Sequence, residues 1–189
     1  MKISLGAKTL LYPTPVMVVG SYSAEGLPNV MTASWGGICC SDPPCLAVSI
    51  REARMTHGNI VRNRAFTVSL PSSSQAAEAD YIGMVSGRDE NKFEKLGLTA
   101  VLGDHVEAPY VGEFPMVIEC RLLHTFELGA HTQFVGQIVD VKVDDSVLTE
   151  EREIDLARLR PILYAPGVST YYEVGEALGR AYNLGKEKS

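Results

Sequence analysis

The chain has 189 residues, of which 46% are apolar and 21% charged, so it can bury an ordinary core and long disordered regions are not expected. Seventeen basic and 23 acidic residues give a formal net charge of −6 at pH 7, with no run of five or six like charges. The chain therefore has no concentrated positive charge that could bind the phosphate backbone of a nucleic acid, and we expect no nucleic-acid partner. We expect one domain over residues 1–189, with a frayed tail at 185–189.

The first apolar stretch does not have the features of a secretion signal. Pro13 and Pro15 interrupt it, and no convincing small-residue cleavage pattern follows. No apolar run reaches the roughly 18 residues that a membrane span needs. The sequence therefore predicts a cytoplasmic protein without a membrane partner.

Short β-prone runs dominate the first seventy residues. Each carries four to seven strand-forming residues, and Gly, Pro, Asn or Asp separates it from the next. The predicted strands cover residues 16–21, 29–34, 45–51 and 66–70. Runs of this length and spacing are typical of a barrel or sandwich.

Two helices are predicted to follow. Ser72, Ser73 and Ser74 offer N-caps for a helix that runs to Ile82. A short helix at residues 91–96 is expected to end at Gly97.

The next pair of predicted strands, at residues 116–128 and 133–144, forms a hairpin through residues 129–131. Near its end Val139, Val141 and Val143 alternate with charged residues. This alternation predicts that the charged residues form one solvent-exposed face of the hairpin. A last helix is expected from a Thr149 cap to Leu159, before Pro161. The whole pattern favours a mostly β, or α+β, fold.

Two hydroxyl-rich clusters stand at the ends of predicted strands. The first is residues 29–35, Asn-Val-Met-Thr-Ala-Ser-Trp, and the second is residues 49–51, Ser-Ile-Arg, followed by Arg54, Thr56 and Asn59. If the two strands are neighbours, these ends present hydroxyl and amide donors, one indole and two guanidiniums around a single cleft. A flat, phosphate-bearing cofactor suits that cleft better than a metal or a nucleophile.

Three of the four cysteines lie close together, at Cys39, Cys40 and Cys45, and the fourth is Cys120. The cluster lacks the C-x2-C pair of metal and iron–sulfur sites, so we interpret all four as small buried hydrophobic residues without disulfides. No dinucleotide fingerprint, phosphate loop, zincin or hydrolase motif occurs, and the four histidines are too scattered to be ligands. We predict neither a catalytic side chain nor a metal site.

Several segments together resemble a known family, the flavin-reductase-like FMN-binding split barrels, and within it the flavoredoxin type. The likeness follows the chain in order and includes the final Arg160-Pro161-x2-Tyr164 and Tyr172. The other matching segments are residues 29–35, 41–44, 49–60, 86–93 and 131–140. Residues 68–69 depart from the pattern, because they read Val-Ser where many relatives have Val-Asn.

The resemblance implies a six-stranded antiparallel split β-barrel with flanking helices, a homodimer, and one noncovalent FMN per subunit near the interface. By resemblance, Thr56 and Lys92 hold the FMN phosphate, with Arg51 and Arg54 as further anion ligands. The implied cofactor-binding residues are Asn29, Thr32, Ala33, Ser34, Trp35, Ser49, Ile50, Arg51, Arg54, Thr56, Lys92 and Tyr172.

Structural roles compete with some of these assignments. Lys92 could be a solvated helix residue, Trp35 a core residue, and Tyr172 a dimer-interface aromatic. The function implied is an FMN flavoprotein that exchanges electrons with a redox protein. The alternatives are an NAD(P)H-dependent flavin reductase and a flavin-binding module without redox activity.

Overall fold

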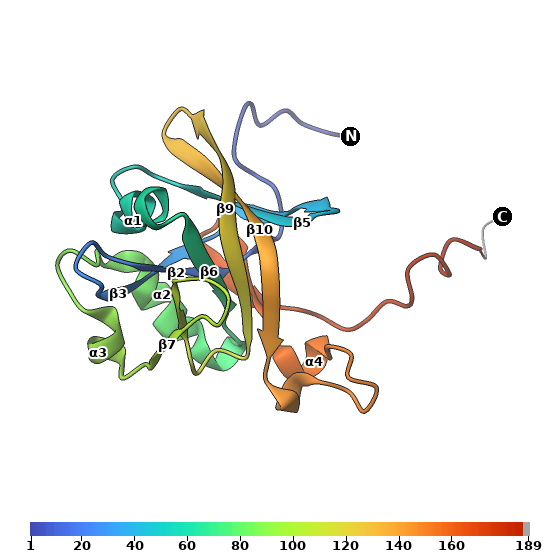
Figure 1. Cartoon of the computed structure of the whole chain (residues 1–189). Helices are drawn as coiled ribbons and strands as arrows, with labels where there is room; N and C mark the ends of the chain where they lie inside the picture. The colour runs from blue at the N-terminus through green and yellow to red at the C-terminus, as the bar shows by residue number, and fades with distance from the viewer. Residues whose placement is uncertain (187–189) are drawn as a thin grey trace.

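The computed structural model describes residues 1–186, so residues 187–189 of the expected frayed tail lie outside the described part (Figure 1). Its principal sheet has the strand order β3-β2-β6-β9-β10-β5-β4, and every neighbouring pair is antiparallel. The strands are β2 (Met17–Tyr22), β3 (Pro28–Ala33), β4 (Gly36–Ser41), β5 (Pro44–Ile50), β6 (Ala65–Leu70), β9 (Met116–Leu128) and β10 (His131–Val143).

The expected mostly β, antiparallel architecture is confirmed, with seven rather than six strands in the principal sheet. All six predicted strands are present, and their ends differ from the prediction by at most two residues. The additional strand is β4, which begins at Gly36-Gly37 and lies at the sheet edge. Glycine has a low strand propensity, and β4 therefore forms through its pairing with β5 rather than through its own sequence.

Two smaller sheets complete the β structure. The first has the order β1-β11-β12, and the second is a two-stranded pair of β7 and β8. Their strands are β1 (Thr14–Pro15), β11 (Ile162–Ala165), β12 (Thr170–Glu173), β7 (Ala100–Leu102) and β8 (Pro109–Val111). Strands of two to four residues carry too little periodicity to stand out in a sequence.

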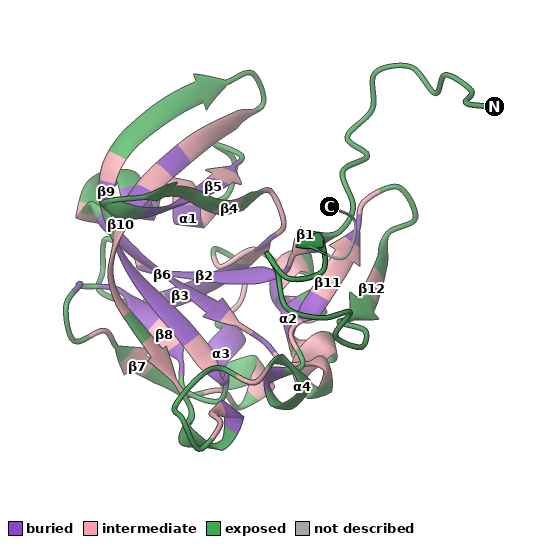
Figure 2. Ribbon diagram, turned by 90° about the vertical axis from the view of Figure 1, so that its right-hand side faces the viewer, coloured by how far each residue is buried: buried purple, intermediate pink, exposed green. Residues whose placement is uncertain are grey.

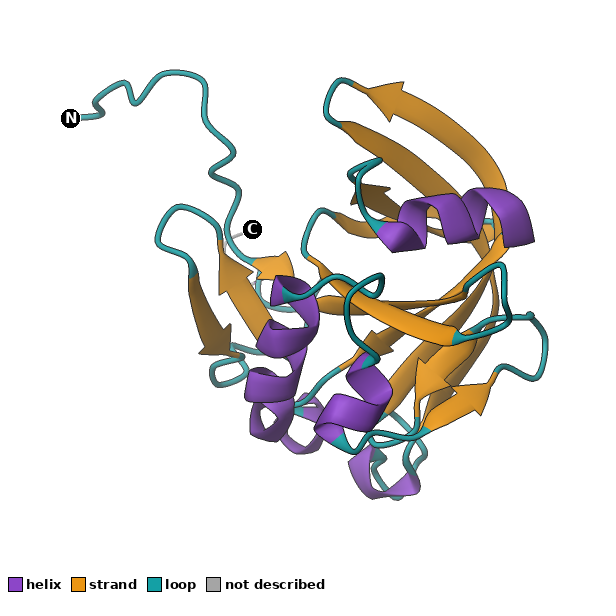
Figure 3. Ribbon diagram, turned by 90° about the vertical axis from the view of Figure 1, so that its left-hand side faces the viewer, coloured by secondary structure: helices purple, strands orange, loops and turns teal. Residues whose placement is uncertain are grey.

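The helices lie around the strands, as Figure 3 shows. They are α1 (Met55–Asn63), α2 (Ala76–Met84), α3 (Lys92–Leu96) and α4 (Leu156–Leu159), with 3-10 turns at Ser73–Gln75 and Asp145–Val147. The predicted start and end of α3 are confirmed, because the Asn91 side chain accepts from the Glu94 amide and Gly97 is left-handed. The longest described helices have nine residues, and none within residues 1–186 has the length and apolar character of a membrane crossing.

The last helix differs from the prediction. Thr149 does not cap a helix, because Leu148 and Ile154 form a β-bridge that folds residues 148–154 into a loop. Within the predicted helix of residues 149–159, only α4 is helical. The Asp155 carboxylate caps it by accepting from the Ala157 amide at 2.8 Å.

Two hydrophobic clusters hold the molecule together, and Figure 2 shows them as the buried centre of the sheets. One lies within the curved principal sheet around Val48, Phe66 and Phe134. The other joins β2 and β3 to α2 and α3. Gly136 allows the sheet to curve over Phe66, because a Cβ there would approach the ring to 2.7 Å. The register also shifts between Val135 and Gly136, where a bulge bends the long hairpin.

The prediction that the charged residues at the end of the hairpin form a solvent-exposed face is wrong. Val141 is 45% exposed, whereas Asp140 and Lys142 turn towards the fully buried Glu119 of β9. The Glu119 carboxylate accepts three backbone amides, from residues 104–106, and forms an ion pair with Lys142. A buried charge requires such partners, and this requirement overrides the apolar alternation.

The prediction that all four cysteines are buried is wrong for two of them. Cys45 and Cys120 are buried, but Cys39 and Cys40 are exposed on β4. Both lie on the edge strand of the principal sheet, near the turn that connects β4 to β5.

Candidate functional site

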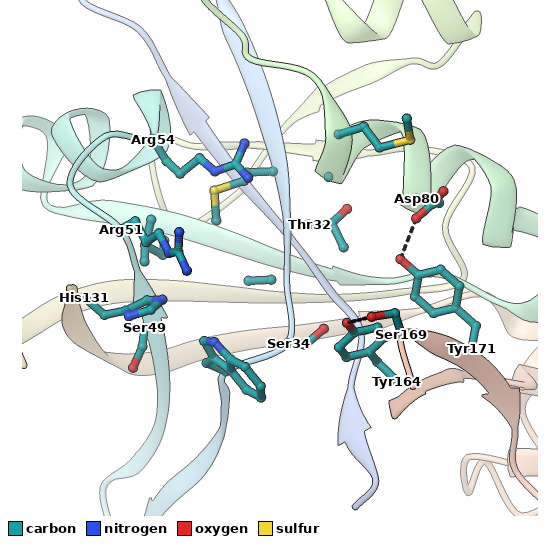
Figure 4. Close-up of a pocket in the computed structure, with 16 residues that line it drawn as sticks. Thr32, Ser34, Ser49, Arg51, Arg54, Asp80, His131, Tyr164, Ser169 and Tyr171 are labelled. Carbon is teal, nitrogen blue, oxygen red and sulfur yellow. Dashed lines mark hydrogen bonds between the residues drawn. The ribbon is translucent and has the colours of Figure 1, made fainter. Parts of the chain in front are cut away.

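The ends of β3 and β5 meet at a cleft of about 500 Å³. The Ser49 amide donates to the Trp35 carbonyl at 2.8 Å, so the two hydroxyl-rich clusters lie side by side as predicted. Helix α2 and the β11–β12 hairpin form the opposite wall (Figure 4). Eight of the twelve predicted residues line this cleft: Thr32, Ala33, Ser34, Trp35, Ser49, Ile50, Arg51 and Arg54.

The floor of the cleft is built from β3. The Thr32 hydroxyl donates to the Ala79 carbonyl of α2 at 2.5 Å, so it anchors the helix to the strand. A Cβ at Gly83 would approach Thr32 to 3.2 Å, which makes a small residue favourable at this turn of α2. Thr32 therefore shapes the cleft, but its hydroxyl proton is already used in the hydrogen bond to Ala79 and is not available to a ligand.

The two arginines of the cleft are free to bind an anion. Within residues 1–186 no carboxylate forms an ion pair with Arg51 or Arg54, and both side chains are exposed. Figure 4 shows both guanidiniums on one side of the cleft with His131, and Asp80 with two tyrosines on the other. The cleft is therefore basic on one side and aromatic on the other.

A second, much smaller hollow adjoins the cleft, because Met31 and Arg54 line both. Three predicted residues, Asn29, Thr56 and Lys92, line this hollow together with Ser86 and Gly87. The Asn29 amide donates to the Thr56 hydroxyl oxygen at 2.9 Å, which leaves the hydroxyl proton available for another acceptor. A Cβ at residue 87 would come within 1.9 Å of the Asn29 oxygen, so the close approach here requires glycine.

Lys92 is not a solvated helix residue, because it is only 4% exposed. Its ammonium donates to the carbonyls of Val30 at 2.8 Å and Ile82 at 2.9 Å, and one of its three protons is left for a ligand. Burial, and secondarily the nearby Arg54 charge, lowers the pKa of Lys92 from 10.5 to about 8. A bound anion would offset both effects.

Helix α1 begins beside the same hollow. Its N-cap residue is Arg54, which makes no side-chain capping hydrogen bond, and its first turn has no acidic residue. The amides of Met55 and Thr56 therefore lack the usual side-chain acceptor. An uncapped helix N-terminus carries partial positive charge and favours an anion.

Two predicted aromatic residues have different surroundings. Trp35 is half-buried between the cleft and a neighbouring hollow of about 380 Å³ that Lys8, Leu10 and Leu11 also line. Tyr172 is 54% exposed and lines neither the cleft nor the smaller hollow.

Tyr171 lines the cleft in place of its neighbour, Tyr172. Its hydroxyl donates to the Asp80 carboxylate at 2.9 Å, and burial together with that hydrogen bond raises the pKa of Tyr171. Adjacent strand residues face opposite sides, so the sequence pointed to the right strand but not to the right tyrosine.

Sequence reasoning missed part of the wall, and it left the role of the departure at residue 69 open. Asp80, His131 and Tyr164 line the cleft but lie on three separate elements. His131 and Tyr164 fall within segments that resemble the family without having been assigned to the cofactor, and no local motif marks Asp80. Ser69, where many relatives have Asn, is buried in β6, and its hydroxyl accepts from the Val111 amide at 3.4 Å. It lines neither hollow, so its role is to join β6 to β8.

Comparison with known proteins supplies the context of this site. The model of the flavin reductase-like domain family matches residues 9–172. Flavoredoxin of Desulfovibrio vulgaris (Miyazaki F) is 52% identical and superposes with a TM-score of 0.94, with coverage of 98% of this chain and all of that one.

Two further solved structures are similar. Flavoredoxin from Methanosarcina acetivorans is 28% identical, with a TM-score of 0.92 and full coverage of both chains. An FMN-binding protein from Thermus thermophilus, with bound 1-cyclohex-2-enone, is 27% identical, with a TM-score of 0.79 and coverage of 95% of this chain and 97% of that one. The curved antiparallel sheet is thus the split barrel of these proteins.

Proposed function

The chain belongs to the flavin reductase-like domain family, and from that premise we propose that it is an FMN-binding electron-transfer flavoprotein of the flavoredoxin type. The observation that carries the proposal is that a cleft of about 500 Å³ adjoins a much smaller hollow with cationic lining, with Met31 and Arg54 lining both. Ligand pockets of about 300–1,000 Å³ are typical of small cofactors. The cleft takes the isoalloxazine ring, and the groups that line the hollow hold the phosphate.

The chemistry of the cleft fits a flavin ring. Backbone groups around Ser34, Trp35 and Ser49 provide donors and acceptors for the polar edge of the ring, while Met31 and Ile50 provide apolar contacts. On the far side, the Tyr171–Asp80 hydrogen bond holds the β11–β12 hairpin against α2. These groups bind and orient the ring.

The polar groups that line the smaller hollow suit a phosphate placed against them at its opening to the cleft, since the free volume of the hollow itself is about 10 Å³. It combines the free Thr56 hydroxyl proton, the remaining Lys92 proton, Arg54 and the uncapped amides of α1. Charge-assisted hydrogen bonds of this kind are the strong ones, and they converge from two elements, the N-terminal end of α1 and α3. A terminal monophosphate satisfies them all, which favours FMN over FAD.

Bound FMN supplies the electron chemistry, and the chain supplies binding, orientation and access. No acid, base or nucleophile of the chain is required, so we assign no catalytic residue. Trp35 borders the ring position and, with the segment of residues 8–11, narrows one approach to it. Stacking of a second ring is then restricted, while electrons can still leave through an exposed edge.

A second function has one observation in its favour. The hollow beside Trp35 measures about 380 Å³ and adjoins the cleft through Ser34 and Trp35. It is large enough to receive part of a nicotinamide nucleotide. An NAD(P)H-dependent flavin reductase is therefore the alternative, and a flavin-binding module without redox activity is the third.

We further propose a homodimer, as the exposed apolar end of the β9–β10 hairpin supports. This end projects from the body of the molecule in Figure 2, and Phe126 and Leu128 on it are 51% and 55% exposed. Exposed apolar side chains grouped on a projecting hairpin are typical of a protein–protein contact.

Anaerobic stopped-flow reduction distinguishes the functions. The FMN-loaded protein is mixed with NADH, with NADPH, or with a reduced low-potential carrier protein, and flavin absorbance is followed. We expect slow reduction by either nicotinamide and fast exchange with the carrier. Rapid saturable bleaching by a nicotinamide, with turnover of added free flavin, would instead establish the reductase. If none of the three reductants bleaches the flavin absorbance, the flavin-binding module without redox activity would be favoured.

A further inference from the structure

The turn end of the β4–β5 hairpin carries three cysteines that the flavin site does not use. Cys40 on β4 lies directly opposite Cys45 on β5 in the antiparallel register. Cys39 falls at the register shift between Ile38 and Cys40, where it has no partner across the ladder. Two thiols are therefore paired across the hairpin and a third lies beside them.

The register places the pair within reach of a disulfide. Directly opposed residues of an antiparallel ladder have Cα atoms about 4.5–5.5 Å apart, and disulfides span about 4.4–6.8 Å. Both sulfur atoms turn towards the same connection. The Cys40 thiol donates to the Asp42 carbonyl at 3.4 Å, and the Cys45 thiol donates to the Pro43 carbonyl at 3.3 Å.

The two thiols differ in access, which gives them different roles. Cys40 is exposed, whereas Cys45 is only 4% exposed. Burial, followed by the neighbouring Cys40 and Cys39, raises the pKa of the Cys45 thiol. An oxidant in solution therefore meets Cys40 first, and Cys45 is shielded until its partner has reacted.

We propose that Cys40 and Cys45 form a redox-active dithiol that exchanges with low-molecular-weight disulfides. The Cys40 thiolate attacks one sulfur of the disulfide RSSR, which forms a mixed disulfide and releases RS⁻, protonated to RSH. Cys45 then loses its proton and attacks the Cys40 sulfur, which forms the Cys40–Cys45 bond and releases the second RSH. The protein loses two electrons and two protons, and RSSR is reduced to two RSH.

This site is separate from the proposed flavin site. Cys40 lies five residues after Trp35, which corresponds to roughly 16 Å along an extended strand, and none of the three cysteines lines the cleft or the smaller hollow. Within residues 1–186 no group of three or more His, Cys, Asp or Glu side chains is arranged to hold a metal ion. The oxidant is therefore external.

The test is a thiol count under defined redox conditions. Full-length FMN-loaded protein is equilibrated with glutathione and glutathione disulfide at a series of ratios, quenched with acid, alkylated, and weighed by intact-mass spectrometry. We expect a transition in which two alkylatable thiols disappear together, with a midpoint independent of protein concentration. Peptide mapping should then find residues 40 and 45 linked.

Three variants assign the roles. Cys39→Ser is the matched control and should oxidise like the unmodified protein. Cys45→Ser should stop at a stable glutathione adduct on Cys40, and Cys40→Ser should form no internal bridge. Flavin absorbance of each sample reports that the variant is folded and loaded, whereas the thiol count does not depend on flavin.

Two results would overturn the proposal. One is an unmodified protein that accumulates glutathione adducts or intermolecular disulfides without an internal bridge. The other is a bridge that survives in Cys40→Ser or disappears in Cys39→Ser, since either would assign the exchange to Cys39.

Discussion

At the scale of single residues, Lys92 joins the scaffold to the proposed phosphate site. Two of its three ammonium protons bind carbonyls of β3 and α2, and the third is left for a ligand. The segment that resembles the family made Lys92 a candidate, but the sequence could not predict that its side chain is buried. Five residues of helix α3 do not reveal which side faces inward, because the side is decided by contacts with β3 and α2.

Lys92→Met should weaken FMN binding by roughly 1.5–3 kcal/mol, which is about a ten- to hundredfold rise in Kd. The matched control is Lys95→Met, because Lys95 lies on the same helix with its side chain 57% exposed. Fluorescence titration of the flavin-free protein measures both. Riboflavin, which lacks the phosphate, should bind both variants alike. Unchanged FMN affinity in Lys92→Met would place the phosphate elsewhere.

The Thr56 hydroxyl should contribute less than Lys92, because it is neutral. Thr56→Ala should raise the Kd for FMN by about three- to tenfold, whereas Thr56→Ser keeps the hydroxyl and should bind nearly as well as the unmodified protein. The same titration measures both variants. Equal losses in the two would indicate a packing effect and would count against a hydrogen bond to phosphate.

The lowered pKa of Lys92 predicts a pH dependence. Between about 8 and 10.5 the unfolded chain binds the Lys92 proton and the folded, flavin-free chain does not, so this residue's contribution to stability rises with pH across that window. The gain is at most roughly 3 kcal/mol. It is measured as the difference in unfolding free energy between the unmodified protein and Lys92→Met at pH 7 and pH 10.5. A difference that does not change with pH would contradict the lowered pKa.

At the scale of elements, prediction from sequence succeeded where periodicity was strong. The strands at residues 16–70 have β-branched runs between turn residues, and the long hairpin has β-branched runs on both of its strands, so all six were found. Helix α1 was missed because Arg54 offers no capping side chain and Gly58 lies within it. The same missing cap is what makes its N-terminus a proposed anion site.

Other elements depend on contacts that are distant in sequence. The solvent-exposed face of β10 was assigned wrongly because Lys142 forms an ion pair with the buried Glu119, about twenty residues earlier, and so turns inward. The cleft wall from β12 was predicted one residue away from the tyrosine that forms it, since Tyr171 rather than Tyr172 meets Asp80. The residue pattern of one strand shows which side chains share a face, but it does not show which of the two faces is buried.

The buried ion pair gives an element-scale prediction. Glu119→Ala should lower the free energy of unfolding by roughly 3–5 kcal/mol, because Lys142 and the amides of residues 104–106 lose their acceptor. The control is Glu151→Ala, which lies exposed in the loop of residues 148–154 and should change stability by less than about 0.5 kcal/mol. Chemical denaturation followed by circular dichroism measures both. Similar small losses in both variants would show that the network is not structural.

At the scale of the whole molecule, the proposed homodimer should sediment at about twice the 20.5 kDa chain mass. Phe126→Asp, at the exposed end of the β9–β10 hairpin, should weaken association, since a charge in an apolar contact is costly. Sedimentation equilibrium at micromolar concentration measures both proteins. A monomeric unmodified protein would contradict the proposal, and a dimer untouched by Phe126→Asp would locate the interface on another surface.

The central claim is that the cleft and the adjoining cationic groups hold FMN through its terminal phosphate. Reconstitution of the flavin-free protein with an equimolar mixture of riboflavin, FMN and FAD, followed by gel filtration, heat release and chromatography, tests it most directly. We predict recovery of FMN, in preference to the other two flavins. Recovery of FAD alone, of riboflavin and FMN in equal amounts, or of no flavin would contradict the account.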